Sequence, residues 1–192
     1  FGENILEVGC ENGIITCFLA RQFPEAKITA VDRCAPAIEV AKLLAQRLNV
    51  TNAEFICCEL SELPRRKYDT LLSSRVAHEN HALISSPAVK GVEAQAELFK
   101  GCFSDYASLL AEFIGEEGSL LSVERTGRTS LFAGWLYALE EAGLVPCEGG
   151  YAEINSRELG SPANFQALVL RHGAVSADAL SSLGIVFEDK ID

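Results

Sequence analysis

A glycine-rich turn near the amino end of the chain is a candidate ligand-binding segment. Glu7 to Gly13 (E-V-G-C-E-N-G) follows a short apolar run and precedes a helical pattern. Gly9 and Gly13 allow the backbone to pass close to a ligand, and the helix that follows directs unpaired N–H groups at it. A dinucleotide fingerprint starting at Gly9 fails, because Glu11 and Ile14 stand where glycines are required. A pyrophosphate would also meet the Glu11 carboxylate, so a ligand without phosphate groups fits the turn better.

Asp32 directly follows the next apolar run and is a candidate for holding a sugar. A carboxylate at this place can accept hydrogen bonds from both hydroxyls of a ribose. The alternative is an ordinary charge in a turn or at the amino terminus of a helix. Together with the glycine turn, Asp32 favours an adenosine-type ligand.

A short polar segment with two histidines, His78-Glu79-Asn80-His81, follows the fourth apolar run. His78 is the candidate general base if the nucleophile carries a proton, as a hydroxyl does. The alternative is a histidine at the start of a helix that bonds to the backbone. Two histidines and one carboxylate on a single short turn are weak indications of a metal, and the zinc spacings C-x-x-C and H-E-x-x-H are absent. We therefore predict no metal site.

The elements that must position these residues alternate between strands and helices. Seven short apolar runs predict strands: 4–8, 27–31, 54–58, 68–73, 119–123, 151–156 and 165–170. Helical periodicity follows the first two runs and returns at about 104–113 and at 129–142. Runs that are apolar without strict alternation, each followed by a helix, are typical of a parallel sheet covered on both faces. The last two runs have no helix between them, so they must pair antiparallel.

Composition indicates a single domain with a sizeable core. The chain has 192 residues, of which 48% are hydrophobic and 22% charged. We predict one domain over 1–173, with 174–192 as a tail or as part of the same domain. The net charge of −11 argues against a nucleic-acid or anionic-membrane partner, because both require a basic surface. The sequence contains no run of 18 apolar residues, so it predicts no membrane span. The seven cysteines include no C-x-x-C pair and indicate reduced thiols, so we expect a cytoplasmic protein.

Four segments resemble the class I S-adenosylmethionine-dependent methyltransferases. They are L-E-V-G-C-E-N-G at 6–13, V-D-R at 31–33, C-E-L-S-E-L-P at 58–64 and Y-D-T-L-L-S-S-R-V at 68–76. The chain departs from the family pattern at Glu11, where many members carry glycine. The resemblance implies an α/β fold with a Rossmann-like, seven-stranded, mostly parallel sheet, helices on both faces and a C-terminal antiparallel hairpin. It also implies S-adenosylmethionine as cofactor and a small-molecule or protein methyl acceptor.

The resemblance further implies roles for residues of the first two loops. Glu7 would fix the glycine turn or reach the methionyl ammonium of the cofactor. Gly9 and Gly13, with Cys10 between them, would border the methionyl portion. Asp32 would hold the ribose.

The remaining implied roles fall at the ends of the second, third and fourth strands. Arg33 would lie against the adenine, whose amino group Glu59 would bind. Leu60 would supply backbone and apolar contacts to the ring. Ser74 would lie beside the sulfonium, and Arg75 would contact the arriving acceptor.

Two other interpretations stay open. A methyltransferase-like domain can serve as a non-catalytic scaffold or binding module, which Glu11 favours. An NAD(P)-binding Rossmann protein would share the sheet but not the glycine spacing. Members of the resembled family usually carry helical residues before the first strand that cover the cofactor. Here such a lid would be missing, supplied by a partner chain, or absent from this segment.

Overall fold

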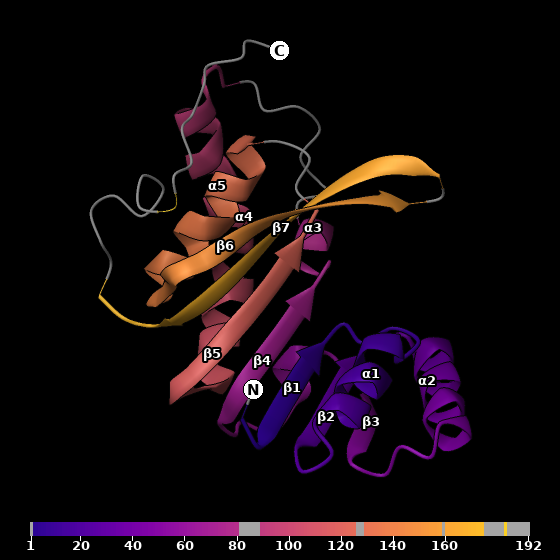
Figure 1. Ribbon diagram of the computed structural model, residues 1–192. Coiled ribbons are helices and arrows are strands. Elements are labelled where there is room, and N and C mark those ends of the chain that lie inside the picture. The colour runs from indigo at the N-terminus through magenta and orange to yellow at the C-terminus, as the bar shows by residue number, and fades with distance from the viewer. Residues whose placement is uncertain (1, 81–88, 126–128, 159, 175–182, 184–192) are drawn as a thin grey trace.

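The computed structural model describes residues 2–80, 89–125, 129–158, 160–174 and 183. Its described strands form a seven-stranded sheet in the order β3-β2-β1-β4-β5-β7-β6 (Figure 1). Their bounds are Asn4–Val8 (β1), Lys27–Asp32 (β2), Ala53–Cys57 (β3), Tyr68–Ser74 (β4), Ile114–Glu124 (β5), Leu144–Glu158 (β6) and Ser161–His172 (β7). Strands β1 to β5 pair in parallel, whereas β7 pairs antiparallel with both β5 and β6. The predicted mostly parallel sheet with a closing antiparallel hairpin is confirmed.

Helices cover both faces of this sheet. They are Ile14–Gln22 (α1), Ala35–Arg47 (α2), Ala77–Asn80 (α3), Val92–Phe113 (α4) and Thr129–Glu141 (α5), with a short 3₁₀ turn, Leu60–Glu62 (η1). The side chains of β1 alternate between two hydrophobic clusters: Leu6 and Val8 pack with residues of α4 and α5, and Ile5 packs with Leu19 of α1. Figure 1 accordingly shows α1 and α2 on one side of the sheet and α4 and α5 on the other.

The core between the sheet and α4–α5 is built around Trp135. This side chain is fully buried; it meets Phe103 edge to face at 5.5 Å between ring centroids and stacks on Tyr106 at 5.8 Å. Its indole N–H donates to Ser122 Oγ on β5 at 2.9 Å, which satisfies the one polar group of the ring. The carboxyl-terminal half of β5 is therefore fixed to α5 by a polar contact as well as by apolar packing.

Several elements are longer than the sequence predicts, including β5 and β7, and the difference is largest for α4 and β6. Helix α4 begins at Val92 rather than near 104, and its buried stripe runs from Ala96 through Phe99 and Phe103 to Leu110. Strand β6 begins at Leu144, and its pairing with β7 shifts register between Pro146 and Tyr151. An irregularity of this kind interrupts the alternation of apolar residues, which hides the first part of the strand from a pattern of period two.

Helix α1 carries apolar side chains on its outer side. The helical spacing of Ile14, Ile15, Phe18 and Leu19 predicts this helix. Leu19 is buried, but Ile14 and Phe18 are 62% and 60% exposed. The buried side of the helix consists of Thr16, Cys17, Leu19 and Ala20. The apolar stripe therefore identifies the helix correctly without identifying the face that packs on the sheet.

Candidate functional site

The candidate site lies at the carboxyl ends of β1 to β4, where the strand order reverses. Strand β1 lies between β2 and β4, so the loops that follow β1 and β4 diverge at this point, as at the ligand sites of open α/β sheets. Asp32 joins the loops after β1 and β2, because its Oδ2 accepts a hydrogen bond from Glu11 N at 2.8 Å. The loop after β3 is joined to the loop after β2, because Cys58 N donates a hydrogen bond to Asp32 O at 3.1 Å.

The glycine turn contains three residues in the left-handed region: Gly9 (φ 72°), Glu11 (φ 47°) and Gly13 (φ 75°). A Cβ atom at Gly9 would lie 2.4 Å from Val76 Cγ2, so this glycine makes room for the loop after β4. A Cβ atom at Gly13 would lie 2.7 Å from Ala41 Cβ, so that glycine permits α1 to pack on α2. Glu11 thus adopts the left-handed backbone that favours glycine, although it carries a side chain.

Glu7 and Cys10 have buried side chains. Glu7 Oε2 accepts a hydrogen bond from Thr16 Oγ1 of α1 at 2.5 Å, and burial raises the pKa of Glu7 to about 7. Glu7 thus connects β1 to the helix that follows the turn. The Cys10 thiol packs with Ala30 and Ile38, and burial raises its pKa as well. Its side chain faces the core, so only the backbone of Cys10 borders the turn.

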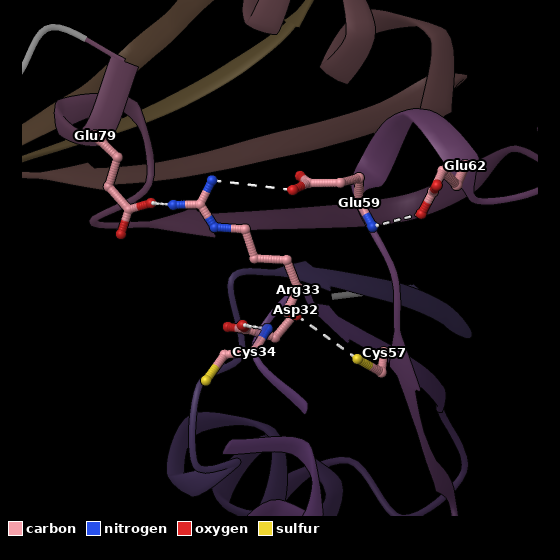
Figure 2. Close-up of polar contacts among 7 residues, drawn as sticks. All are labelled: Asp32, Arg33, Cys34, Cys57, Glu59, Glu62 and Glu79. Carbon is pink, nitrogen blue, oxygen red and sulfur yellow. Dashed lines mark hydrogen bonds and ion pairs between the residues drawn. The ribbon is translucent and has the colours of Figure 1, made fainter. Parts of the chain in front are cut away.

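Arg33 lies between two carboxylates at the mouth of the site, as Figure 2 shows. Its Nη2 lies 2.8 Å from Glu79 Oε2, and its Nη1 lies 3.9 Å from Glu59 Oε1. All three side chains are more than half exposed. The guanidinium therefore links the loops after β2 and β3 with α3.

Glu59 and Leu60 are neighbours in sequence, but the Glu59 side chain is exposed and the Leu60 side chain is buried. Glu59 precedes η1, and its N–H donates to Glu62 Oε2 at 3.1 Å, while its own side chain is exposed (Figure 2). Leu60 is buried and packs in the same cluster as Val31 and Leu63. The Glu59 carboxylate is accessible to a ligand, whereas the Leu60 side chain faces the core.

The end of β4 turns sharply into α3. Ser73 is buried and its hydroxyl lies 2.9 Å from that of Tyr106, whereas Ser74 is half-buried. Arg75 is exposed and adopts a left-handed backbone (φ 63°), with its N–H donating to Val123 O at 2.9 Å. His78 lies in α3, but its side chain is outside the described residues, as is all of His81.

The structure adds two residues to this edge, Glu124 and Tyr106, that the sequence-based site does not include. Glu124 ends β5, is buried, and accepts hydrogen bonds from Val76 N and Ala77 N. Tyr106 reaches the end of β4 from α4. A signal for Glu124 was present, because an acid directly after an apolar run is the same pattern that identified Asp32. Tyr106 has no such signal, since a tyrosine in a helical stripe is typical of a core.

The described part of the chain contains neither a metal-binding cluster nor a helix able to span a membrane. No group of three or more His, Cys, Asp or Glu side chains in it is arranged to hold a metal ion. No helix within the same described ranges is both long and apolar enough to span a membrane.

Comparisons with known proteins agree on one family. A family model described as "Methyltransferase domain" matches residues 2–129. Malonyl-[acyl-carrier protein] O-methyltransferase of Acetivibrio thermocellus is 39% identical over 72 residues, 37% of this chain and 24% of that protein. Ribosomal RNA small subunit methyltransferase C of Buchnera aphidicola subsp. Baizongia pistaciae is 30% identical over 81 residues, 42% of this chain and 25% of that protein. The chain thus spans about a quarter of the length of these relatives.

A solved structure supports the same fold. The TehB-like SAM-dependent methyltransferase of Corynebacterium glutamicum superposes with a TM-score of 0.57 and 19% identity over 90% of this chain and 81% of its own.

The ribosomal RNA relative bears on the expectation that nucleic acid is not a partner. Its presence means that the argument from net charge against a nucleic-acid partner is not supported.

Proposed function

Because the chain belongs to the methyltransferase domain family, we propose that it binds S-adenosylmethionine and transfers the methyl group to a small-molecule or protein acceptor. One observation carries this proposal: the glycine turn, Asp32 and Glu59 lie at the ends of three adjacent strands, and hydrogen bonds from Glu11 N and Cys58 N to Asp32 join the loops that carry them. A nucleoside placed across these strand ends would meet an acceptor for its sugar and another for its base.

The polar atoms at this edge fit the cofactor. Asp32 Oδ2 accepts one hydrogen bond from Glu11 N and Oδ1 accepts one from Cys34 N, both at 2.8 Å. Each carboxylate oxygen has a second acceptor position, so both ribose hydroxyls could still be bound. The Asp32 side chain is only partly buried, and Glu59 is exposed, so both can be reached from solution. The backbone at Gly9, Cys10 and Gly13 would border the methionyl portion.

The chain's contribution to catalysis is chiefly orientation. When bound, the cofactor supplies a methyl group activated by a positively charged sulfur. Ser74 at the end of β4 would lie beside the sulfonium, and Arg75 after it would contact the arriving acceptor. Alignment alone contributes about 7–11 kcal/mol in the most favourable intramolecular models. His78 is our candidate base for an acceptor that must lose a proton.

Calorimetric titration with S-adenosylhomocysteine tests the proposal. We expect the folded domain to bind it, and Asp32→Ala to weaken binding by about 1–3 kcal/mol, because the ribose loses its acceptor. Glu25→Ala is the matched control, since it removes an exposed acid beside the amino end of β2, away from the site. Equal affinity in wild type and Asp32→Ala would remove Asp32 from the site.

One alternative has a specific observation in its favour. Glu11 places a carboxylate in the turn where the methionyl carboxylate would bind, which favours a non-catalytic scaffold. A folded wild-type domain that releases no heat with S-adenosylhomocysteine would support this alternative. Thermal stabilisation by NAD, with none by S-adenosylhomocysteine, would instead revive an NAD(P)-binding protein.

A further inference from the structure

Glu124 is a buried acid that the proposed chemistry does not use. Its side chain is 1% exposed at the carboxyl end of β5. Oε1 accepts hydrogen bonds from Val76 N at 3.3 Å and from Ala77 N at 3.2 Å. Val76 precedes α3 and Ala77 is its first residue, so one side chain of β5 holds the backbone that follows the neighbouring strand β4. Hydrogen bonds from backbone N–H groups to a carboxylate are about twice as strong as neutral ones.

The segment that Glu124 holds is a wall of the candidate site. Val76 packs against Gly9 so closely that a side chain at Gly9 would overlap it, with 2.4 Å between its Cβ and Val76 Cγ2. Arg75, the preceding residue, is tied to the same strand β5 through its N–H bond to Val123 O. The position of this wall relative to the glycine turn is therefore set from β5.

The surroundings of Glu124 make its position well defined. Ser122, two residues earlier and on the same side of β5, accepts the Trp135 indole N–H. Tyr106 is close enough for the Glu124 charge to contribute to the raised pKa of its hydroxyl, although burial is the larger cause. Both aromatic side chains are packed in the core beneath β4 and β5. Glu124 thus projects from a strand end that is packed against the core.

We propose that Glu124 is a positioning residue that holds residues 75–77 against the glycine turn and thereby shapes the acceptor side of the cofactor site. It acts through the backbone of Val76 and Ala77 rather than by touching the methyl group. The effect on ligand binding rests on the proposed function, whereas the hold on the segment does not depend on any ligand.

Four variants separate this role from the general cost of altering a buried acid. Glu124→Gln keeps an oxygen that can accept from the two N–H groups. Glu124→Met fills a similar volume without an acceptor and leaves both donors unpaired, and Glu124→Ala also leaves a cavity. Glu140→Ala is the matched control, because Glu140 is a buried acid of α5 that is outside the candidate site.

Two measurements test the proposal: amide hydrogen exchange of Val76 and Ala77 without ligand, and calorimetric affinity for S-adenosylhomocysteine. Since each lost hydrogen bond is worth roughly a factor of ten, Glu124→Met should raise the exchange rates about tenfold and weaken binding about three- to tenfold. Glu124→Gln should stay near wild type in both measurements, and Glu140→Ala should change neither. If Glu124→Ala does not fold, the comparison of Glu124→Met with Glu124→Gln still tests the proposal.

Three results would overturn the proposal. The first is unchanged exchange of Val76 and Ala77 in Glu124→Met. The second is equal loosening in Glu124→Gln, which retains the acceptor. The third is wild-type affinity in Glu124→Met despite faster exchange, which would place the segment outside the cofactor site. If the wild-type domain does not bind S-adenosylhomocysteine, the proposed function fails, and the exchange measurements still decide whether Glu124 holds the segment.

Discussion

Arg33 and Glu79 form an ion pair with 2.8 Å between Nη2 and Oε2, although they are 46 residues apart in the chain. Arg33 follows β2 and Glu79 lies in α3 after β4, so the pair spans the end of β1, which lies between these strands. Both side chains are mostly exposed, and pairs of this kind contribute at most about 1 kcal/mol to stability. The contact can therefore open easily, and its effect should be seen on ligand exchange rather than on folding.

We predict that Glu79→Gln speeds dissociation of S-adenosylhomocysteine a few-fold at low salt and changes the free energy of unfolding by less than about 1 kcal/mol. The pair crosses the mouth of the proposed site, and salt screens it. Stopped-flow dissociation at low and high salt measures the effect. A double-mutant cycle with Arg33→Gln is the control, because the two substitutions should be less than additive. A dissociation rate in Glu79→Gln equal to that of wild type at every salt concentration would contradict the prediction.

Glu11 occupies a left-handed backbone position (φ 47°) that costs a residue with a side chain about 1–2 kcal/mol. We predict that Glu11→Gly tightens binding of S-adenosylhomocysteine, because it removes a carboxylate near the methionyl carboxylate. Its effect on stability should be below about 1 kcal/mol, since the relief of strain is offset by the entropy of glycine in the unfolded chain.

Glu11→Ala separates charge from strain, because it removes the carboxylate but keeps the unfavourable backbone. It should bind like Glu11→Gly and should unfold at lower denaturant concentration than Glu11→Gly. Calorimetry and urea unfolding of the three proteins provide the measurements. If Glu11→Gly binds more weakly than wild type, the carboxylate assists binding and the prediction is wrong.

The buried Glu7 predicts a stability that depends on pH. Burial raises the pKa of Glu7 to about 7 in the folded protein, from an ordinary value near 4.5. The folded state therefore binds more protons between these values, and stability falls as the pH rises from about 4.5 to 7. At about 1.4 kcal/mol per pH unit, the loss is on the order of 3 kcal/mol.

Glu7→Gln should remove this dependence, because the amide carries no charge and can still accept from Thr16 Oγ1. We expect the variant to be more stable than wild type at pH 8 and similar to it at pH 4.5. Urea unfolding at several pH values gives the difference in the free energy of unfolding between wild type and Glu7→Gln. The contributions of the other acidic residues are the same in both proteins and drop out of this difference. Parallel pH profiles would show that Glu7 does not titrate differently on folding.

The contact between Ser73 and Tyr106 predicts a modest cost for removing one hydroxyl. Tyr106→Phe leaves the buried Ser73 hydroxyl without this partner and should lower the free energy of unfolding by about 1–2 kcal/mol. Adding Ser73→Ala should cost little more, because the unpaired group is then absent. Chemical denaturation of the single and double variants measures the coupling, and fully additive effects would mean that the two hydroxyls do not interact.

The sheet was predictable from the sequence because strands buried on both faces need largely apolar runs, and β1, β2 and β4 provide them. The beginning of α4 was missed, although the stripe from Ala96 to Phe103 has helical spacing. The first part of β6 has no clear pattern, because its register shift around Gly149 breaks the alternation. Local periodicity thus identifies regular helices and strands, but it does not identify the part of a strand that a register shift interrupts.

The candidate site was predictable to the extent that it follows strand ends. Asp32, Glu59 and Gly9 lie at the expected edge, since parallel strands bring their following loops together. The contacts among Arg33, Glu59 and Glu79 were not predictable, because they depend on how far long side chains reach across neighbouring strands. The buried orientation of the Cys10 and Leu60 side chains also follows from packing rather than from position. The roles of these residues toward a ligand stay predictions.

The exposed Ile14 and Phe18 on the outside of α1 have a consequence for handling the domain in solution. Two molecules that associate through this helix would bury apolar surface, but the net negative charge of each molecule opposes their association. Concentrated salt or mild acid weakens that repulsion without altering the fold. We therefore expect clustering to set in under those conditions first, and glutamates substituted for these two side chains to delay it.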